Sequence, residues 1–277
     1  MEMILLFLTG IVGGTIGSLL GLGGGVIIVP ALLFLNYLPQ IELAISPQMA
    51  VGTSLIIIIV TAVSSTIAYR KQKRIDYRSA FLFFLGSGPG ALVGALLNQK
   101  INIQQFYLSF GIILIVIFLL MTLKKRHPGK TNQVQVRHKI KKTFVDDFGE
   151  EHEYGYSLPL ALGVSFVVGA MSGLFGIGGG ALMVPTMLYI FRFPPHVAVA
   201  TSMLIILLSS SVGAGTHILL GNVIWSYALM LAPGAWLGGK LGPIITRRLS
   251  SVAVVNCFKV VFLIIAIRMV LKGGGIG

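Results

Sequence analysis

Long apolar runs, separated by short polar stretches, dominate the hydrophobic pattern of this chain. Six of these runs are close to the roughly 20 residues that an α-helix needs to cross a bilayer: 51–69, 79–98, 101–123, 197–220, 223–245 and 252–271. Two further apolar segments, 3–38 and 157–191, are longer still, and each contains a cluster of glycines. The pattern predicts an all-α polytopic membrane protein.

The two glycine clusters belong to a motif that occurs twice. Residues 17–30 read GSLLGLGGGVIIVP, and residues 172–185 read SGLFGIGGGALMVP, at an offset of 155. Two further echoes follow in the same order, Ala-Val-x-Thr-Ser at 50–54 and 198–202, and Pro-Gly-Ala-x-x-Gly at 89–94 and 233–238. The duplication predicts two homologous transmembrane repeats, 1–123 and 157–277, joined by a charged linker, 124–156.

Three consecutive glycines are unfavourable inside a helix, since each costs about 1 kcal/mol relative to alanine. The second limbs of the segments, 26–37 and 181–191, are also too short to span about 30 Å alone. We therefore predict interrupted or re-entrant helices at the glycine clusters, the arrangement found in transporters built from repeats. The helix that begins after each cluster would present free N–H groups and a positive dipole end to an anion.

Close helix packing is the alternative role for glycine. Small residues at intervals of four let membrane helices approach, and this spacing assigns a packing role to Gly13, Gly17, Gly94, Gly238 and Gly242. Packing needs one glycine per turn, so the consecutive triplets favour a binding site. For the Thr-Ser pairs the sequence leaves two roles open, substrate donors or hydroxyls bonded to their own helix.

The basic residues indicate the orientation of the repeats, because basic loops stay cytoplasmic. Thirteen of the 21 Lys and Arg residues lie within two segments, 70–78 and 124–142. If the repeats are inverted, Arg192, Arg247 and Arg248 join these on one side, and the loop bases divide 16 to 2 rather than 14 to 4. The pattern thus favours inverted repeats and a cytoplasmic linker. The linker itself is either a solvated, poorly ordered loop, which its charge blocks favour, or a regulatory segment that binds a partner.

Composition and missing motifs exclude several function classes. Only 10% of the residues are charged, against about 25% in soluble domains, and no RNA-binding motif accompanies the net charge of +13, so we expect no nucleic acid partner. We predict no enzyme, because the chain lacks nucleophile, acid–base and metal constellations. No cofactor and no metal site are expected: the lone cysteine is Cys257, and the Asp146-Asp147 pair lacks flanking ligands.

Ionisable residues within the apolar runs are few. All eight acids lie outside these runs, which removes the usual carboxylate proton relay. His217 ends a run and is expected at the membrane interface, whereas Lys259 lies within one and is a candidate for attracting an anion.

The doubled GxGGGxxxxP segment, the Ala-Val-x-Thr-Ser stretch and the Pro-Gly-Ala-x-x-Gly stretch resemble the TauE/SafE family of membrane permeases, described as sulfite or organosulfonate exporters. The resemblance covers nearly the whole chain outside the linker. It implies a multi-pass permease of a bacterial or archaeal plasma membrane for small anions such as sulfite or a short sulfonate. The chain departs from the family where Asp76-Tyr77 of the first half has Ile224-Trp225 as its counterpart.

From the residues and the resemblance together we expect export of a small anion across the lipid bilayer. The alternatives are cation-coupled uptake and a permease subunit of a larger complex. The oligomeric state stays open, a homo-oligomer included. The expected substrate-binding residues are Gly21, Gly23, Gly24, Gly25, Val26, Pro30, Thr53, Ser54, Gly176, Gly178, Gly179, Gly180, Ala181, Pro185, Thr201, Ser202 and Lys259.

Overall fold

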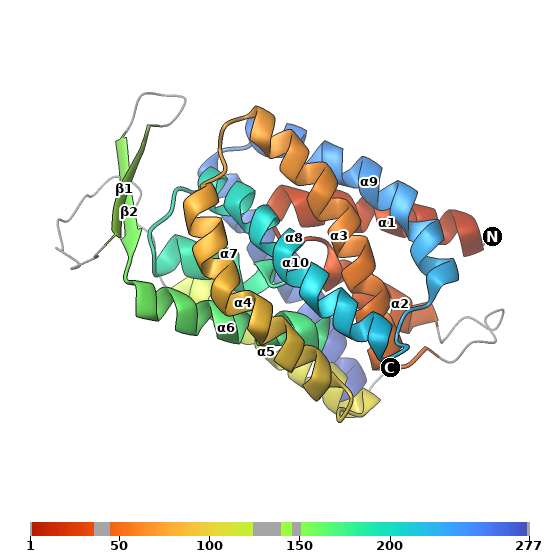
Figure 1. Ribbon diagram of the computed structural model, residues 1–277. Helices are drawn as coiled ribbons and strands as arrows, with labels where there is room; N and C mark the ends of the chain where they lie inside the picture. The colour runs from red at the N-terminus through yellow and green to blue at the C-terminus, as the bar shows by residue number, and fades with distance from the viewer. Residues whose placement is uncertain (1, 36–44, 124–139, 146–150, 276–277) are drawn as a thin grey trace.

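The protein is a bundle of long apolar helices that encloses two short ones (Figure 1). A computed structural model describes residues 2–35, 45–123, 140–145 and 151–275. The helices of the first half are α1 (Glu2–Leu20), α2 (Gly25–Leu35), α3 (Pro47–Lys71), α4 (Tyr77–Asn98) and α5 (Ile103–Leu123). Those of the second half are α6 (Leu158–Phe175), α7 (Gly180–Tyr189), α8 (Pro195–Leu219), α9 (Trp225–Arg248) and α10 (Ser251–Gly273).

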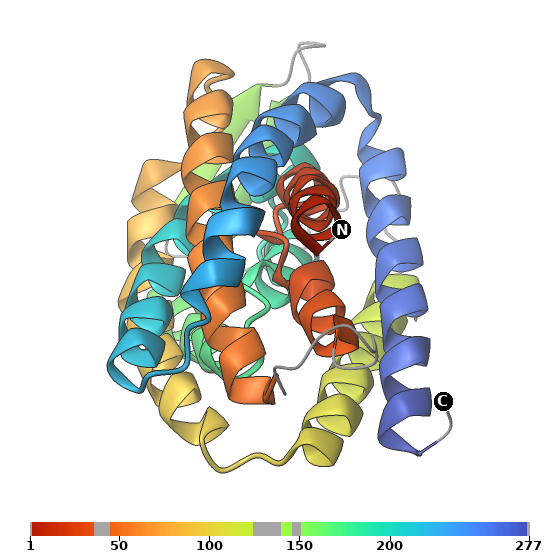
Figure 2. The ribbon, with the colours of Figure 1, turned by 90° about the vertical axis from the view of Figure 1, so that its right-hand side faces the viewer.

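Eight of these helices are long and apolar enough to cross a membrane, and α2 and α7 are shorter. The prediction of an all-α polytopic membrane protein is confirmed. Both glycine clusters interrupt their apolar segments, between Leu20 and Gly25 and between Phe175 and Gly180. In Figure 2, α1 is seen nearly end-on while α2 lies side-on below it, so the chain changes direction at the first interruption.

The two halves are interleaved, because each first helix packs on the fourth helix of the other half. Glycines allow this close approach. A Cβ atom built on Gly10 would lie on the Leu231 carbonyl, and one on Gly238 would lie 2.5 Å from the Ile11 carbonyl oxygen. Gly90 and Gly94 of α4 meet α6 in the same way. The packing role of Gly94, Gly238 and Gly242 is therefore confirmed, and Gly13 and Gly17 of α1 pack against the first interruption.

The contacts also fix the helix directions. Thr61 of α3 lies at Gly239 and Tyr69 lies at Thr246, so α3 runs parallel to α9. By contrast, Leu55 of α3 lies at Gly213 and Gly52 lies at His217, so α3 and α8 run in opposite directions. The central pair α3 and α8 is the most buried of the spanning helices.

The contacts bring most basic segments to one end of the bundle. Gln72, just after α3, donates to the Pro243 carbonyl near the end of α9, which places residues 70–78 near Arg247 and Arg248. The Gly155 N–H donates to the Phe191 carbonyl, next to Arg192. At the opposite end, Gln104 donates to the Gly273 carbonyl, which brings Lys272 to the beginning of α5, close to Lys100.

The linker ends in an antiparallel hairpin of β1 (Ile140–Val145) and β2 (Glu151–Tyr156). Tyr156 is fully buried against Phe83 of α4 and the Phe191–Phe193 turn. Tyr154 donates to the Asp76 carboxylate at 3.2 Å, and Ser79 bonds both Asp76 and Tyr156. Burial and the Asp76 carboxylate raise the pKa of the Tyr154 phenol, so it stays a donor at physiological pH. The interpretation of the whole linker as a poorly ordered loop is therefore wrong for residues 151–156. The Asp146-Asp147 pair lies outside the described residues.

Candidate site at the two helix interruptions

The interruptions owe their shape to glycine. Six glycines adopt the left-handed backbone region that other residues rarely enter. They are Gly21, Gly23 and Gly24 in the first interruption and Gly176, Gly178 and Gly179 in the second, with φ between 66° and 99°. Each of the three glycines of the first interruption has its counterpart in the second at the offset of 155. The same backbone path is thus built twice.

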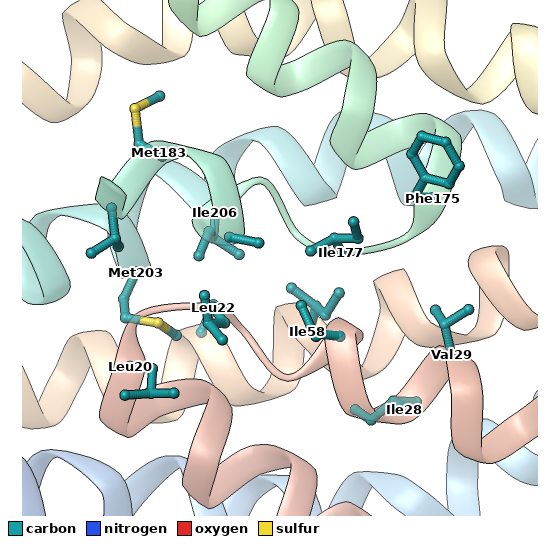
Figure 3. Packing of buried hydrophobic residues seen from close by; sticks show 14 of the residues in the cluster. Leu20, Leu22, Ile28, Val29, Ile58, Phe175, Ile177, Met183, Met203 and Ile206 are labelled. Carbon is teal, nitrogen blue, oxygen red and sulfur yellow. The ribbon is translucent and has the colours of Figure 1, made fainter. Parts of the chain in front are cut away.

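The two interruptions are in direct backbone contact. A Cβ atom on Gly25 would lie on the Gly176 carbonyl oxygen, and one on Gly180 would lie on the Gly21 carbonyl oxygen. No residue larger than glycine fits either position without moving the opposite backbone. Figure 3 shows the two interruptions facing each other across a layer of aliphatic side chains.

Serines fasten each interruption to the other half. Ser54 Oγ donates to the Gly176 carbonyl at 3.0 Å, and Ser202 Oγ donates to the Gly21 carbonyl at 2.9 Å. Both hydroxyls also lie within hydrogen-bond distance of a carbonyl in their own helix. The serines therefore tie each break to the long helix of the other half.

The neighbouring threonines have a capping role. Thr53 Oγ1 accepts from the Ile224 N–H at 2.9 Å, and Thr201 Oγ1 accepts from the Asp76 N–H at 3.0 Å. Ile224 and Asp76 are the N-cap residues of α9 and α4. In this conformation the four predicted hydroxyls thus hold the halves together. This contact between the halves is a role that differs from the two that the sequence left open.

The first N–H groups of α2 and α7 are the unusual feature of the site. Among the described residues, no backbone carbonyl accepts from the N–H groups of Gly25, Val26, Gly180 and Ala181. All four residues are buried, whereas more than about 90% of buried backbone donors in proteins are paired. Two helix N-termini with buried, unpaired donors are suited to a small anion.

The remaining predicted residues are placed differently. Pro30 and Pro185 lie buried within α2 and α7, one turn beyond the unpaired donors. Lys259 lies half-buried on α10, which packs mainly on α5, and no hydrogen bond or ion pair joins it to the interruptions within the described part of the chain. A surface hollow of about 500 Å³, lined by Thr66, Ile67, Arg70 and Tyr77, contains none of the predicted site residues.

Two buried polar side chains were missed by the sequence interpretation. His217 is fully buried within the protein, and its Nε2–H donates to the Gly173 carbonyl at 3.2 Å. Its counterpart at the offset of 148 is Tyr69, which donates to the Ser18 carbonyl at 2.8 Å. Both carbonyls belong to the last turn before an interruption. Tyr69 and His217 share the offset of 148 with the Thr-Ser pairs. This shared offset is the feature of the sequence that could have indicated a matched role for the two residues.

Comparison with known proteins identifies the family of this chain. The family model for the sulfite exporter TauE/SafE matches residues 6–269, nearly the entire chain. The chain belongs to the TauE/SafE family. It is therefore a multi-pass membrane protein of a transporter family.

Relatives of this TauE/SafE chain come from bacteria and an archaeon. The chain is 47% identical to the probable membrane transporter protein YunE of Bacillus subtilis over 274 residues, which cover 99% of both chains. It is 29% identical to a probable membrane transporter protein of Xylella fastidiosa, over 86% of this chain and 84% of the relative. It is 27% identical to the probable membrane transporter protein MJ0441 of Methanocaldococcus jannaschii, over 89% and 87%. No solved structure gives a significant match.

Proposed function

We propose that this TauE/SafE transporter exports a small anion, sulfite or a short organosulfonate, through a site formed at the two helix interruptions. The observation that carries the proposal is the set of buried, unpaired N–H groups at the beginnings of α2 and α7. An oxyanion would accept from such donors without a cationic side chain. The matched family is itself described as a sulfite exporter, which supports this substrate class.

The charge distribution supports export. Within the described helices, the only acidic residue is Glu2 at the beginning of α1, so the spans offer no carboxylate to carry protons. A monovalent anion that leaves an inside-negative cell gains about 2.3 kcal/mol per 100 mV, and export therefore needs no coupling ion. Cation-coupled uptake is the second candidate, since backbone carbonyls at the interruptions can hold Na⁺.

Exchange in proteoliposomes that contain only this protein tests the proposal. We expect vesicles loaded with unlabelled sulfite to accumulate labelled sulfite from outside, and sulfoacetate to compete. Sulfate and a cation serve as controls for size and for sign. Exchange without a second protein would also exclude the alternative of a permease subunit, and its complete absence for all sulfur oxyanions would contradict the proposed substrate class.

We also propose that the halves are inverted repeats with the base-rich end in the cytoplasm. Matched helices run in opposite directions at the α3–α8 pair, and residues 70–78, Arg192, Arg247 and Arg248 share one end. Positive residues favour the cytoplasmic side.

Cysteine labelling in intact cells checks this topology. In a Cys257→Ser background, we expect Arg78→Cys and Ser250→Cys, both at exposed positions, to resist an impermeant thiol reagent. The control Lys100→Cys, exposed at the other end, should react. Labelling of Arg78→Cys and Ser250→Cys from different sides would show that the repeats are not inverted.

A further inference from the structure

Four aliphatic side chains occupy the space between the two interruptions (Figure 3). Leu22 and Ile177 come from the interruptions themselves, and Ile58 and Ile206 come from α3 and α8. They form two matched pairs, Leu22 with Ile177 at the offset of 155 and Ile58 with Ile206 at 148. All four are buried, with at most 2% of the side chain exposed.

The two isoleucines contact both interruptions. A Cβ atom built on Gly23 would lie 2.8 Å from Ile58 Cγ2 and 3.1 Å from Ile206 Cγ2. Ile58 also reaches Gly25 and Gly178, and Ile206 reaches Gly180. The side chains therefore lie directly beside the backbone whose N–H groups are unpaired.

An anion cannot pass such a layer while it is closed. Moving a charge into apolar surroundings without compensating partners costs several kcal/mol or more, and hydrophobic constrictions are known to gate pores by excluding water. The serine bonds and the glycine contacts keep the interruptions together in this conformation.

We propose that Leu22, Ile58, Ile177 and Ile206 form the closed gate of the anion pathway. The inference rests on the proposed site at the interruptions. When the two interruptions separate, Leu22 and Ile177 move with the interruptions and away from Ile58 of α3 and Ile206 of α8, and the N–H groups become accessible. Each matched pair has one residue in each half of the chain. A movement of one half relative to the other therefore separates the two members of both pairs.

Chloride leak from proteoliposomes tests the gate. The variant is Ile58→Ala with Ile206→Ala, and the matched control is Ile57→Ala with Ile205→Ala, which removes the same atoms from adjacent buried positions of the same helices. With potassium and valinomycin to balance charge, we expect the gate variant to release chloride at least about tenfold faster than the control. Equal leak rates would overturn the gate.

The leak assay separates the gate from the substrate. Chloride is not a sulfur oxyanion, so a leaking gate variant supports the gate even if the wild type exchanges no sulfite. Sulfite exchange by the wild type together with a tight gate variant would support the site and refute the gate. If the alanine variant is not recovered folded, valine replaces alanine in both proteins, which removes fewer atoms. The variant is then Ile58→Val with Ile206→Val, and its control is Ile57→Val with Ile205→Val.

Discussion

Gly179→Val is expected to reduce sulfite exchange by about tenfold or more, equivalent to about 1.4 kcal/mol. Gly179 is the N-cap of α7, and its left-handed backbone (φ 71°) directs the first N–H groups of the helix. The nearest atoms to an added Cβ lie 3.5 Å away, on Ser172 and Val168, so the first carbon fits the packing of this conformation. The remaining atoms of valine would compete with an anion for the space at the helix end.

The matched control is Gly221→Val. Gly221 has nearly the same φ, 72°, and no other atom lies within 4 Å of an added Cβ. Both variants therefore carry the same strain of a β-branched residue in the left-handed region, but only one lies at the proposed site. Sulfite exchange is normalised to the folded protein in the vesicles. If Gly179→Val and Gly221→Val then exchange sulfite equally, Gly179 has a conformational role and does not lie at the binding site.

Gly169→Leu is expected to destroy the packing of α6 on α4, with loss of monodisperse protein or a large fall in Tm. A Cβ on Gly169 would lie on the Ser87 carbonyl and 2.6 Å from Ser87 Cα. These are backbone atoms of another helix, and overpacking that cannot be relieved by side-chain movement costs at least the usual 1–3 kcal/mol or so.

Gly163→Leu in the same helix is the control for that substitution. No atom lies within 4 Å of an added Cβ at this exposed position, so its Tm in detergent should stay close to the wild-type value. A similar Tm for both variants would contradict the close approach of α4 and α6.

The sequence predicts the interruptions and the packing glycines because both follow from local rules. Three adjacent glycines disfavour a helix wherever they occur, and a glycine in every turn favours close helix contact. The structure accordingly breaks the helices at Gly21 and Gly176 and packs Gly94 and Gly238 against other helices.

Contacts between the halves could not be predicted in this way. Ser54 meets Gly176 because α3 crosses the second interruption, and nothing in the spacing of either residue indicates this. The burial of His217 could not be predicted because its position in the sequence only ends an apolar run, whereas the tertiary fold covers it with Gly52 and Gly173. Likewise, the charge of the linker concealed the burial of Tyr156 against Phe83.

In the proposed function, the interruptions carry an anion along its own electrochemical gradient. The most direct measurement is sulfite efflux from proteoliposomes of this protein alone at imposed membrane potentials, with equal pH and no Na⁺ on either side. For a monovalent anion, 100 mV corresponds to about 2.3 kcal/mol, so we predict efflux that rises with inside-negative voltage and reverses when the voltage is reversed. Efflux that requires a proton or Na⁺ gradient, or flux of the cation control in place of the anion, would contradict the account.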